Sequence, residues 1–189
     1  MHKLHNTMPN LALQFKGDLQ NVTDLVPADD LETELLVSLK CTSCQEEHPR
    51  PVALVPSNVA EMQKSRGEAT LVMNCNGCRR ENSASYVVKS PGGNEEGGLG
   101  KTSPWQPIAG GDDAPEWQTL CTVEFRGMEP LEPKIDSVLA ESSSWKCKGI
   151  ESGTPFDEVQ FEDGEWHDYD EKAGEEVGIT DVELRWKRV

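Results

Sequence analysis

The chain has 189 residues, enough for one domain or for two small ones that share a core. Hydrophobic residues make up 35% of it, more than a disordered chain shows, so a folded protein is expected. Acidic residues outnumber basic ones 34 to 18, and a net charge of -16 repels both phosphate backbones and anionic membrane surfaces. This balance argues against nucleic acid and membranes as partners.

The N-terminus, MHKLHNTMPNLALQF, lacks the apolar stretch of a secretory signal, and no apolar run approaches the roughly 20 residues of a membrane span. We therefore expect a cytoplasmic protein, with the nucleus as a further compartment. In a reducing compartment, six cysteines are more often metal ligands or free thiols than disulfides.

Apolar and polar residues alternate with period two along most of the chain, which predicts strands. The alternating segments are residues 11–17, 34–40, 70–74, 121–127, 157–161 and 181–189. The best helical candidate is short, residues 57–65 with Ser57 as the N-cap. The pattern predicts an all-β, sandwich-like fold with sheets packed face to face.

A Gly-, Pro- and acid-rich stretch interrupts this alternation and predicts a solvated loop or linker. The expected organisation is a zinc-binding β half at 1–90, a linker at 91–117 and a second, metal-free β half at 118–189. The halves share an order of short matches, FKG at 15–17 with FRG at 125–127, then Lys40-Cys41 with Lys146-Cys147. An ancient duplication would explain this order.

Two CxxC pairs carry the chemistry: Cys41 with Cys44, and Cys75 with Cys78. A CxxC turn aims both thiolates at one ion, and two such turns supply the tetrahedral set of a structural zinc. Each pair follows an alternating strand, as expected when two hairpin tips meet over one metal. We predict one zinc ion per chain, held by these four cysteines.

Other uses of the cysteine pairs remain open. A redox dithiol normally occurs once and beside a βαβ pattern, which this chain lacks. An iron–sulfur cluster also takes four cysteines, but the tandem arrangement is commoner for zinc. A nucleic-acid-binding finger is disfavoured by the net charge, and Lys40, Arg79 and Arg80 instead offset the charge of the thiolates.

The two remaining cysteines are not predicted ligands. Cys121 lies on the apolar face of its segment and is expected to be a core thiol. Cys147 has Ile150 where a CxxC partner would stand. Aligned by the duplication, Cys147 corresponds to Cys41, so the second half is expected to be held by its aromatic core alone.

A second conspicuous stretch is acidic and aromatic, and it has two interpretations. It could anchor a loop against the core, or it could be a docking surface for a basic protein partner. The candidate docking residues are Trp166, Asp168, Tyr169, Asp170 and Glu171.

The sequence resembles the eukaryotic CXXC-motif-containing zinc-binding proteins. The resemblance rests on LALQFKGDLQNVTDL, CTSC, SRGEATLVMNCNGCRRENS, FRGMEP and GEWHDYDEKAGEEVGI, which together span both halves. It implies an elongated all-β fold of two pseudo-symmetric halves, with zinc held in one of them by Cys41, Cys44, Cys75 and Cys78. Residues 91–116 form a longer segment than the family pattern suggests.

The leading hypothesis is a non-enzymatic, monomeric, zinc-binding protein whose metal is structural and whose acidic surface binds a protein partner. No catalytic constellation is visible in the sequence. The alternative is metal or redox handling, in which the CxxC pairs exchange zinc or copper(I) with another carrier.

Overall fold

The protein is described by a computed structural model over residues 10–88, 99–140 and 143–189. Within these residues it has fifteen strands and one helix of four residues, which confirms the predicted all-β class. The strands are β1 (Asn10–Gln20), β2 (Val22–Pro27), β3 (Leu35–Val37), β4 (Leu39–Cys41), β5 (Val52–Leu54), β6 (Ala60–Glu61), β7 (Glu68–Ala69), β8 (Leu71–Asn74), β9 (Glu81–Tyr86), β10 (Gln118–Arg126), β11 (Met128–Pro130), β12 (Trp145–Gly149), β13 (Pro155–Val159), β14 (Trp166–Asp170) and β15 (Glu175–Arg188); the helix is α1 (Ile135–Val138).

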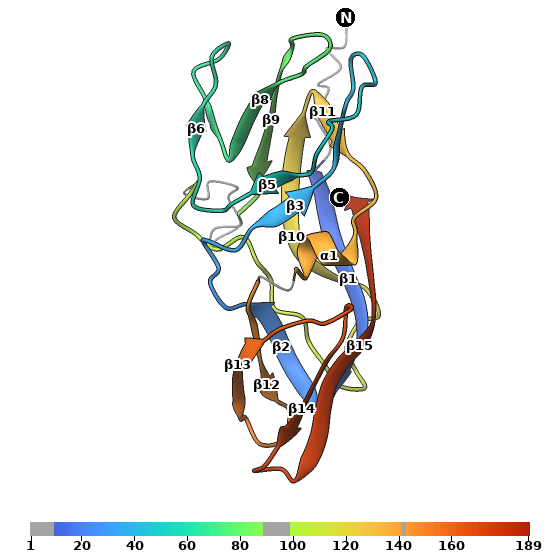
Figure 1. The fold of residues 1–189 in the computed structure, drawn as a ribbon. Helices are drawn as coiled ribbons and strands as arrows, with labels where there is room; N and C mark the ends of the chain where they lie inside the picture. The colour runs from blue at the N-terminus through green and yellow to red at the C-terminus, as the bar shows by residue number, and fades with distance from the viewer. Residues whose placement is uncertain (1–9, 89–98, 141–142) are drawn as a thin grey trace, which may run out of the picture.

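A six-stranded sheet runs the length of the elongated molecule, in the order β14-β15-β1-β10-β9-β8 (Figure 1). Its neighbouring strands are all antiparallel. Residues 12–15 of β1 and 177–179 of β15 are buried in succession, and because successive side chains point to opposite faces, both faces of the sheet are covered there.

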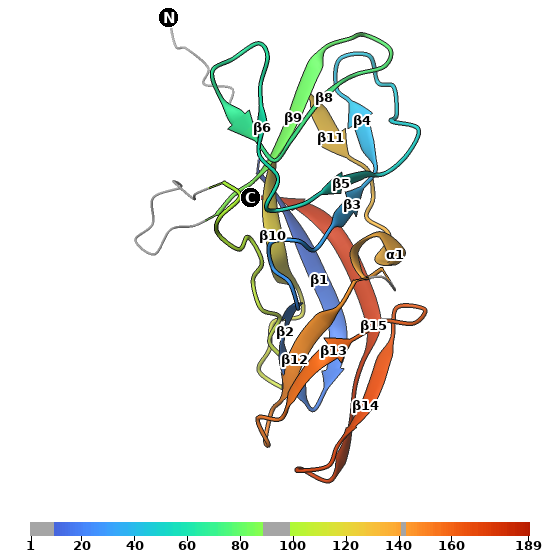
Figure 2. The ribbon, with the colours of Figure 1, turned by 60° about the vertical axis from the view of Figure 1, so that its left-hand side comes forward.

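Smaller sheets cover this central sheet. They are the three-stranded sheet β13-β12-β2 and the pairs β11-β4, β3-β5 and β6-β7. Most buried apolar side chains form one hydrophobic cluster, shared by the central sheet, the sheet β13-β12-β2 and the pairs β11-β4 and β3-β5. As Figure 2 shows, β4, β6, β8, β9 and β11 lie toward one end of the molecule and β12, β13 and β14 toward the other.

The two halves of the sequence exchange strands. From the central β1–β10 pair outward, β1 is followed by β15 and β14, and β10 by β9 and β8. In the same way β2 pairs with β12, while β11 pairs with β4. The first two strands of each sequence half therefore pair with the remaining strands of the other half. Both ends of the molecule are built from both sequence halves, and the expected boundaries at 90 and 118 do not separate them.

Part of the predicted linker is packed rather than solvated. Trp105 is 7% exposed and Ile108 is fully buried. The backbone of Ile108 exchanges two hydrogen bonds with Leu25 of β2, and the amide of Gln106 donates to Leu120 of β10. Residues 104–108 thus form a strap across the core; composition alone suggested a loop because two apolar anchors are too few to set a period. Residues 91–98 of the predicted linker lie outside the described residues.

The prediction of a helix at residues 57–65 is wrong. This segment contains β6 instead, paired with β7 in a small hairpin. Amide groups of Gln63 and Lys64 donate to the carboxylate of Glu81, a partner distant in sequence that a local pattern cannot reveal.

Among the described residues, no helix is both long and apolar enough to span a bilayer.

Candidate metal centre

Two turns of the same backbone geometry present the four predicted ligands. In the turn after β4, the amide of Gln45 donates to the carbonyl of Cys41 (2.9 Å), and the amide of Cys41 donates to the carbonyl of Glu46 (2.9 Å). Gln45 takes a left-handed conformation, with φ of 65°, that closes the turn.

The turn between β8 and β9 repeats this pattern residue by residue. The amide of Arg79 donates to the carbonyl of Cys75 (3.0 Å), and the amide of Cys75 donates to Arg80 (2.9 Å). Arg79 has φ of 60°. In both turns the cysteines occupy the first and fourth positions, and the left-handed residue occupies the fifth.

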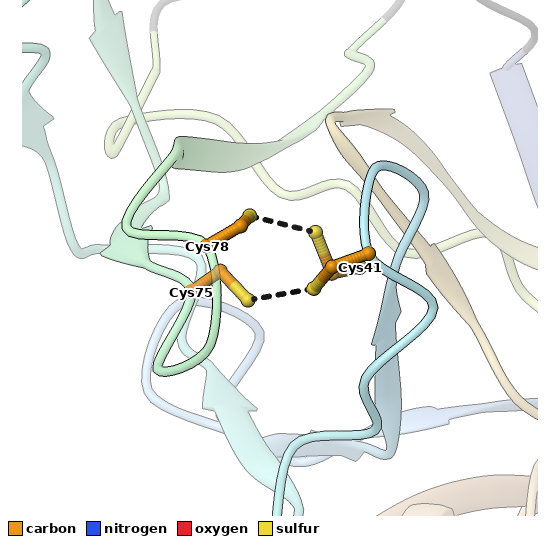
Figure 3. A group of neighbouring side chains, drawn as sticks. Cys41, Cys75 and Cys78 are labelled. Atoms are coloured by element: carbon orange, nitrogen blue, oxygen red, sulfur yellow. Dashed lines mark hydrogen bonds between the residues drawn. The ribbon is translucent and has the colours of Figure 1, made fainter.

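The turns face each other and bring all four sulfur atoms together (Figure 3). The sulfurs of Cys41 and Cys78 lie 3.7 Å apart, and those of Cys44 and Cys75 lie 3.5 Å apart. All four lie within 4.8 Å of one another. Zinc–sulfur bonds of about 2.3 Å in a tetrahedron place the sulfurs about 3.8 Å apart, so the four cysteines fit one zinc ion.

Two thiols of this cluster, Cys41 and Cys44, have pKa values shifted in opposite directions. Hydrogen bonds from the backbone of Cys44 and Ser43 lower the pKa of Cys41 to about 6. For Cys44 the hydrogen bond from the Glu46 backbone lowers the pKa, but proton sharing with Cys75 and burial outweigh it, and the pKa rises to about 11. Adjacent thiolates repel one another, and a cation bound between them would offset that repulsion.

The basic residues beside the cysteines form specific contacts. The guanidinium of Arg80 donates to the hydroxyl of Ser43 (2.9 Å) and so links the two turns directly. The ammonium of Lys40 pairs with Glu129 of β11 (2.9 Å) rather than with the sulfur cluster. His48 is half-buried, its Nδ1 pairs with the carbonyl of Arg50 (2.6 Å), and it does not belong to the four-residue ligand group.

The two other cysteines are core residues remote from this cluster. Cys121 is fully buried on β10, where burial raises the pKa of its thiol. Cys147 is 5% exposed on β12, and burial together with the charge of Asp168 raises its pKa to about 12. Neither belongs to the four-sulfur group among the described residues.

The structure divides the predicted docking stretch between the surface and the interior. Trp166 is 8% exposed and packs edge-on against Phe156, and Asp170 is only 1% exposed. Both side chains are buried, so neither offers a large surface to a partner. Asp168, Tyr169 and Glu171 are exposed, so a docking role for these three stays a prediction.

Sequence analysis missed the buried position of Asp170. Its carboxylate accepts hydrogen bonds from two hydroxyls and two backbone amides. A turn here could have been expected, because an aspartate side chain often accepts a hydrogen bond from the backbone amide two residues on, as Asp170 does from Lys172.

Comparison with known proteins places this centre in a known family. The family model of the CXXC motif containing zinc binding protein, eukaryotic, matches residues 12–187. The CXXC motif containing zinc binding protein of Xenopus laevis is 31% identical over 96% of this chain and 99% of its own length. The human protein of the same name is 29% identical over 93% of this chain and 96% of its own.

Solved structures share the fold. The crystal structure of C1orf123 has a TM-score of 0.76 and 28% identity, and the match covers 95% of this chain and 99% of that one. A hypothetical protein from Plasmodium falciparum has a TM-score of 0.71 at 19% identity, over 95% and 100% of the two chains, which shows the fold alone. With four cysteines positioned for one ion, this chain belongs to the family of eukaryotic CXXC motif containing zinc binding proteins.

Proposed function

We propose that the zinc is structural and that the protein is a non-enzymatic, cytoplasmic protein-interaction module with an acidic surface. The observation that carries the structural role is the closure of the ligand set. Four cysteine sulfurs fill the tetrahedral shell of zinc, whereas a catalytic zinc keeps one position for water or substrate.

The surroundings of the centre support the same role. A cavity beside Cys41 and Cys75 has a volume of only about 20 Å³, room for about one water molecule. The two ligand turns come from different sheets, β11-β4 and the six-stranded sheet. An ion bound between them would therefore fasten the end of the large sheet to a smaller one.

A second candidate function, metal exchange with another carrier, is favoured by the exposure of part of the site. Cys41 and Cys75 are 4% and 6% exposed, but Cys44 is exposed and Cys78 is half-buried. A competing thiol could approach from the side of Cys44 and take over the ligands one at a time.

Chelation separates these two functions. If the zinc is structural, removing about one ion per chain should lower the melting temperature and speed amide exchange in both ligand turns. If the zinc is cargo, a competing carrier should take it within minutes while melting stays unchanged. Zinc content, thermal melting and hydrogen exchange on the same samples distinguish them, and a chelated protein that melts as before would contradict the structural role.

The interaction role rests on the exposed acidic residues. Tyr169 is 52% exposed and lies between the exposed carboxylates Asp168 and Glu171 on the β14 hairpin. An exposed aromatic ring on a hairpin that also carries exposed carboxylates suits a partner that presents a basic, partly apolar face. With a net charge of -16, association with such a partner should slow as salt rises.

We expect Asp168→Asn with Glu171→Gln to lose bound protein partners in affinity capture. Glu61→Gln with Glu68→Gln is the matched control, because these exposed carboxylates on the β6–β7 hairpin carry the same charge far along the chain. Captured proteins are compared by mass spectrometry at low and high salt. Equal capture by both double variants would remove the case for the β14 hairpin.

A further inference from the structure

The end of the molecule remote from the sulfur cluster contains a turn with the backbone of the zinc turns. Between β12 and β13, the amide of Gly149 donates to the carbonyl of Thr154 (2.9 Å), and the amide of Gly153 donates to Gly149 (3.0 Å). Gly153 has φ of 68°, beside 65° for Gln45. Gly149 therefore occupies the first position of this turn, as Cys41 does in its own.

The β14–β15 hairpin supplies a fourth turn of this kind. The amide of Gly174 donates to the carbonyl of Asp170 (2.7 Å), and Gly174 has φ of 73°. Asp170 pairs with Glu175 in the strand register. Asp170 thus stands at the first position of its turn, as Cys75 does in the β8–β9 turn.

The fold makes these turns equivalent to the zinc turns. β12 pairs with β2 as β4 pairs with β11, and β14–β15 continue outward from β1 as β8–β9 continue outward from β10. The exchange of strands between the sequence halves thus gives each end of the molecule one turn of each kind. At one end the two turns carry cysteines; at the other they carry Gly149, Ser152, Asp170 and Ala173 at the corresponding positions.

A buried carboxylate joins the two cysteine-free turns. One oxygen of Asp170 accepts a hydrogen bond from the hydroxyl of Ser152, and the other accepts one from the hydroxyl of Thr154 (3.0 Å). The amides of Lys172 (3.0 Å) and Ala173 (3.1 Å) also donate to it. The hydrogen bond from Ser152 above all holds the pKa of Asp170 below its usual range. The Lys172 ammonium donates to the Ser152 carbonyl (2.7 Å), a second link across the turns.

The two residues joined by the hydrogen bond between Ser152 and Asp170 occupy the same turn positions as two cysteines whose sulfurs lie close together. Ser152 stands at the fourth position, like Cys44, and Asp170 at the first, like Cys75; the Cys44 and Cys75 sulfurs are 3.5 Å apart. A Cβ added to Gly149 would collide with the Ser152 hydroxyl and the Asp170 carboxylate. The side chain of a residue at 149 would therefore point into the centre of the group, as a metal ligand must.

We propose that Gly149, Ser152, Asp170 and Ala173 form a metal-free counterpart of the zinc centre. In it the Asp170 carboxylate holds two turns together as zinc holds the cysteine turns. The backbone keeps the geometry of a four-ligand site, and the side chains alone decide whether the turns are held by an ion or by hydrogen bonds.

Installing cysteine at the four counterpart positions tests this proposal. The variant Gly149→Cys, Ser152→Cys, Asp170→Cys and Ala173→Cys removes the carboxylate and hydroxyl that occupy the centre. Purified with zinc present, it should bind about two zinc ions per chain, against about one for the unmodified protein. Metal content by mass spectrometry on both proteins gives the result.

The matched control uses the alignment suggested by the sequence. It keeps Cys147 and carries Ile150→Cys with the Asp170 and Ala173 substitutions, so it also has four cysteines at this end. We expect it to bind about one zinc. A folded four-cysteine graft with one zinc, or a control with two, would overturn the proposal.

If the four-cysteine variant does not fold with zinc present, the milder variant Ser152→Ala tests the proposal instead. Losing a hydrogen bond to a charged acceptor should speed exchange of the Gly149 and Gly153 amides about tenfold or more, with zinc content unchanged. Exchange at the Cys41 and Gln45 amides is the internal reference. Unchanged exchange at Gly149 and Gly153 would then refute the counterpart.

Discussion

Replacing Cys41 or Cys75 with serine is expected to remove most of the zinc and to destabilise the metal end of the molecule. A serine hydroxyl is a poor substitute for a thiolate, and the three remaining sulfurs leave one position to water. Structural zinc contributes about 10–16 kcal/mol of apparent binding free energy in small peptides, a ceiling for a chain with its own core. The measurements are zinc content and thermal melting.

This loss should be local as well as large. Cys41 and Cys75 are buried, but the main hydrophobic cluster does not include them, so it should survive the loss of the ion. Amide exchange should accelerate first in the turns at Gln45 and Arg79. Cys147→Ala is the matched control: it also removes a buried thiol, and it should keep about one zinc per chain. Full zinc occupancy in Cys41→Ser, or zinc loss in Cys147→Ala, would mean that the ligands are misassigned.

The sequence was sufficient to find the sulfur cluster because the chemistry there is local. Each CxxC pair lies in one turn, and the strand before it sets the direction in which the turn points. The spacing of the cysteines could not predict that the two turns share the same backbone geometry, because that geometry depends on the left-handed conformations of Gln45 and Arg79. Neither residue is a glycine, and nothing in the local pattern marks them.

The internal duplication shows the opposite case. The matching Lys-Cys pairs aligned Cys147 with Cys41, but backbone hydrogen bonding makes Gly149 the counterpart, two residues later. Where the ligand side chains have been lost, only the backbone geometry marks the position equivalent to a zinc ligand. A short match between side chains cannot locate that position. The exchange of strands between the halves was also beyond the sequence, because pairing such as β2 with β12 spans more than a hundred residues.

The strap at residues 104–108 is the clearest difference between composition and structure. Trp105 lies between Tyr86 of β9 and Trp145 of β12, with ring centroids 5.9 and 6.2 Å away. Trp145 in turn packs edge-on against Phe161. This row of aromatic rings runs from β9, next to the second cysteine turn, toward the cysteine-free end. Trp105, in a segment rich in Gly and Pro, links Tyr86 to Trp145 within it.

Trp105→Ala is therefore expected to destabilise the whole protein. Truncating a buried tryptophan costs about 3–5 kcal/mol, because its transfer free energy is lost and a cavity remains. The variant also loses the hydrogen bond from the indole nitrogen to the carbonyl of Asp30 (2.9 Å). Urea denaturation followed by circular dichroism measures the change in the free energy of unfolding.

Gln106→Ala is the matched control for this strap. Its side chain is exposed, and its hydrogen bond to Leu120 comes from the backbone amide, which alanine retains. It should change the free energy of unfolding by less than about 0.5 kcal/mol. A similar small effect from Trp105→Ala would show that the strap lies on the core without supporting it. A large loss of unfolding free energy in Trp105→Ala but not in Gln106→Ala, with the same zinc content, would show that the strap supports the core. The end with the cysteine turns and the cysteine-free end would then be stabilised through one shared core.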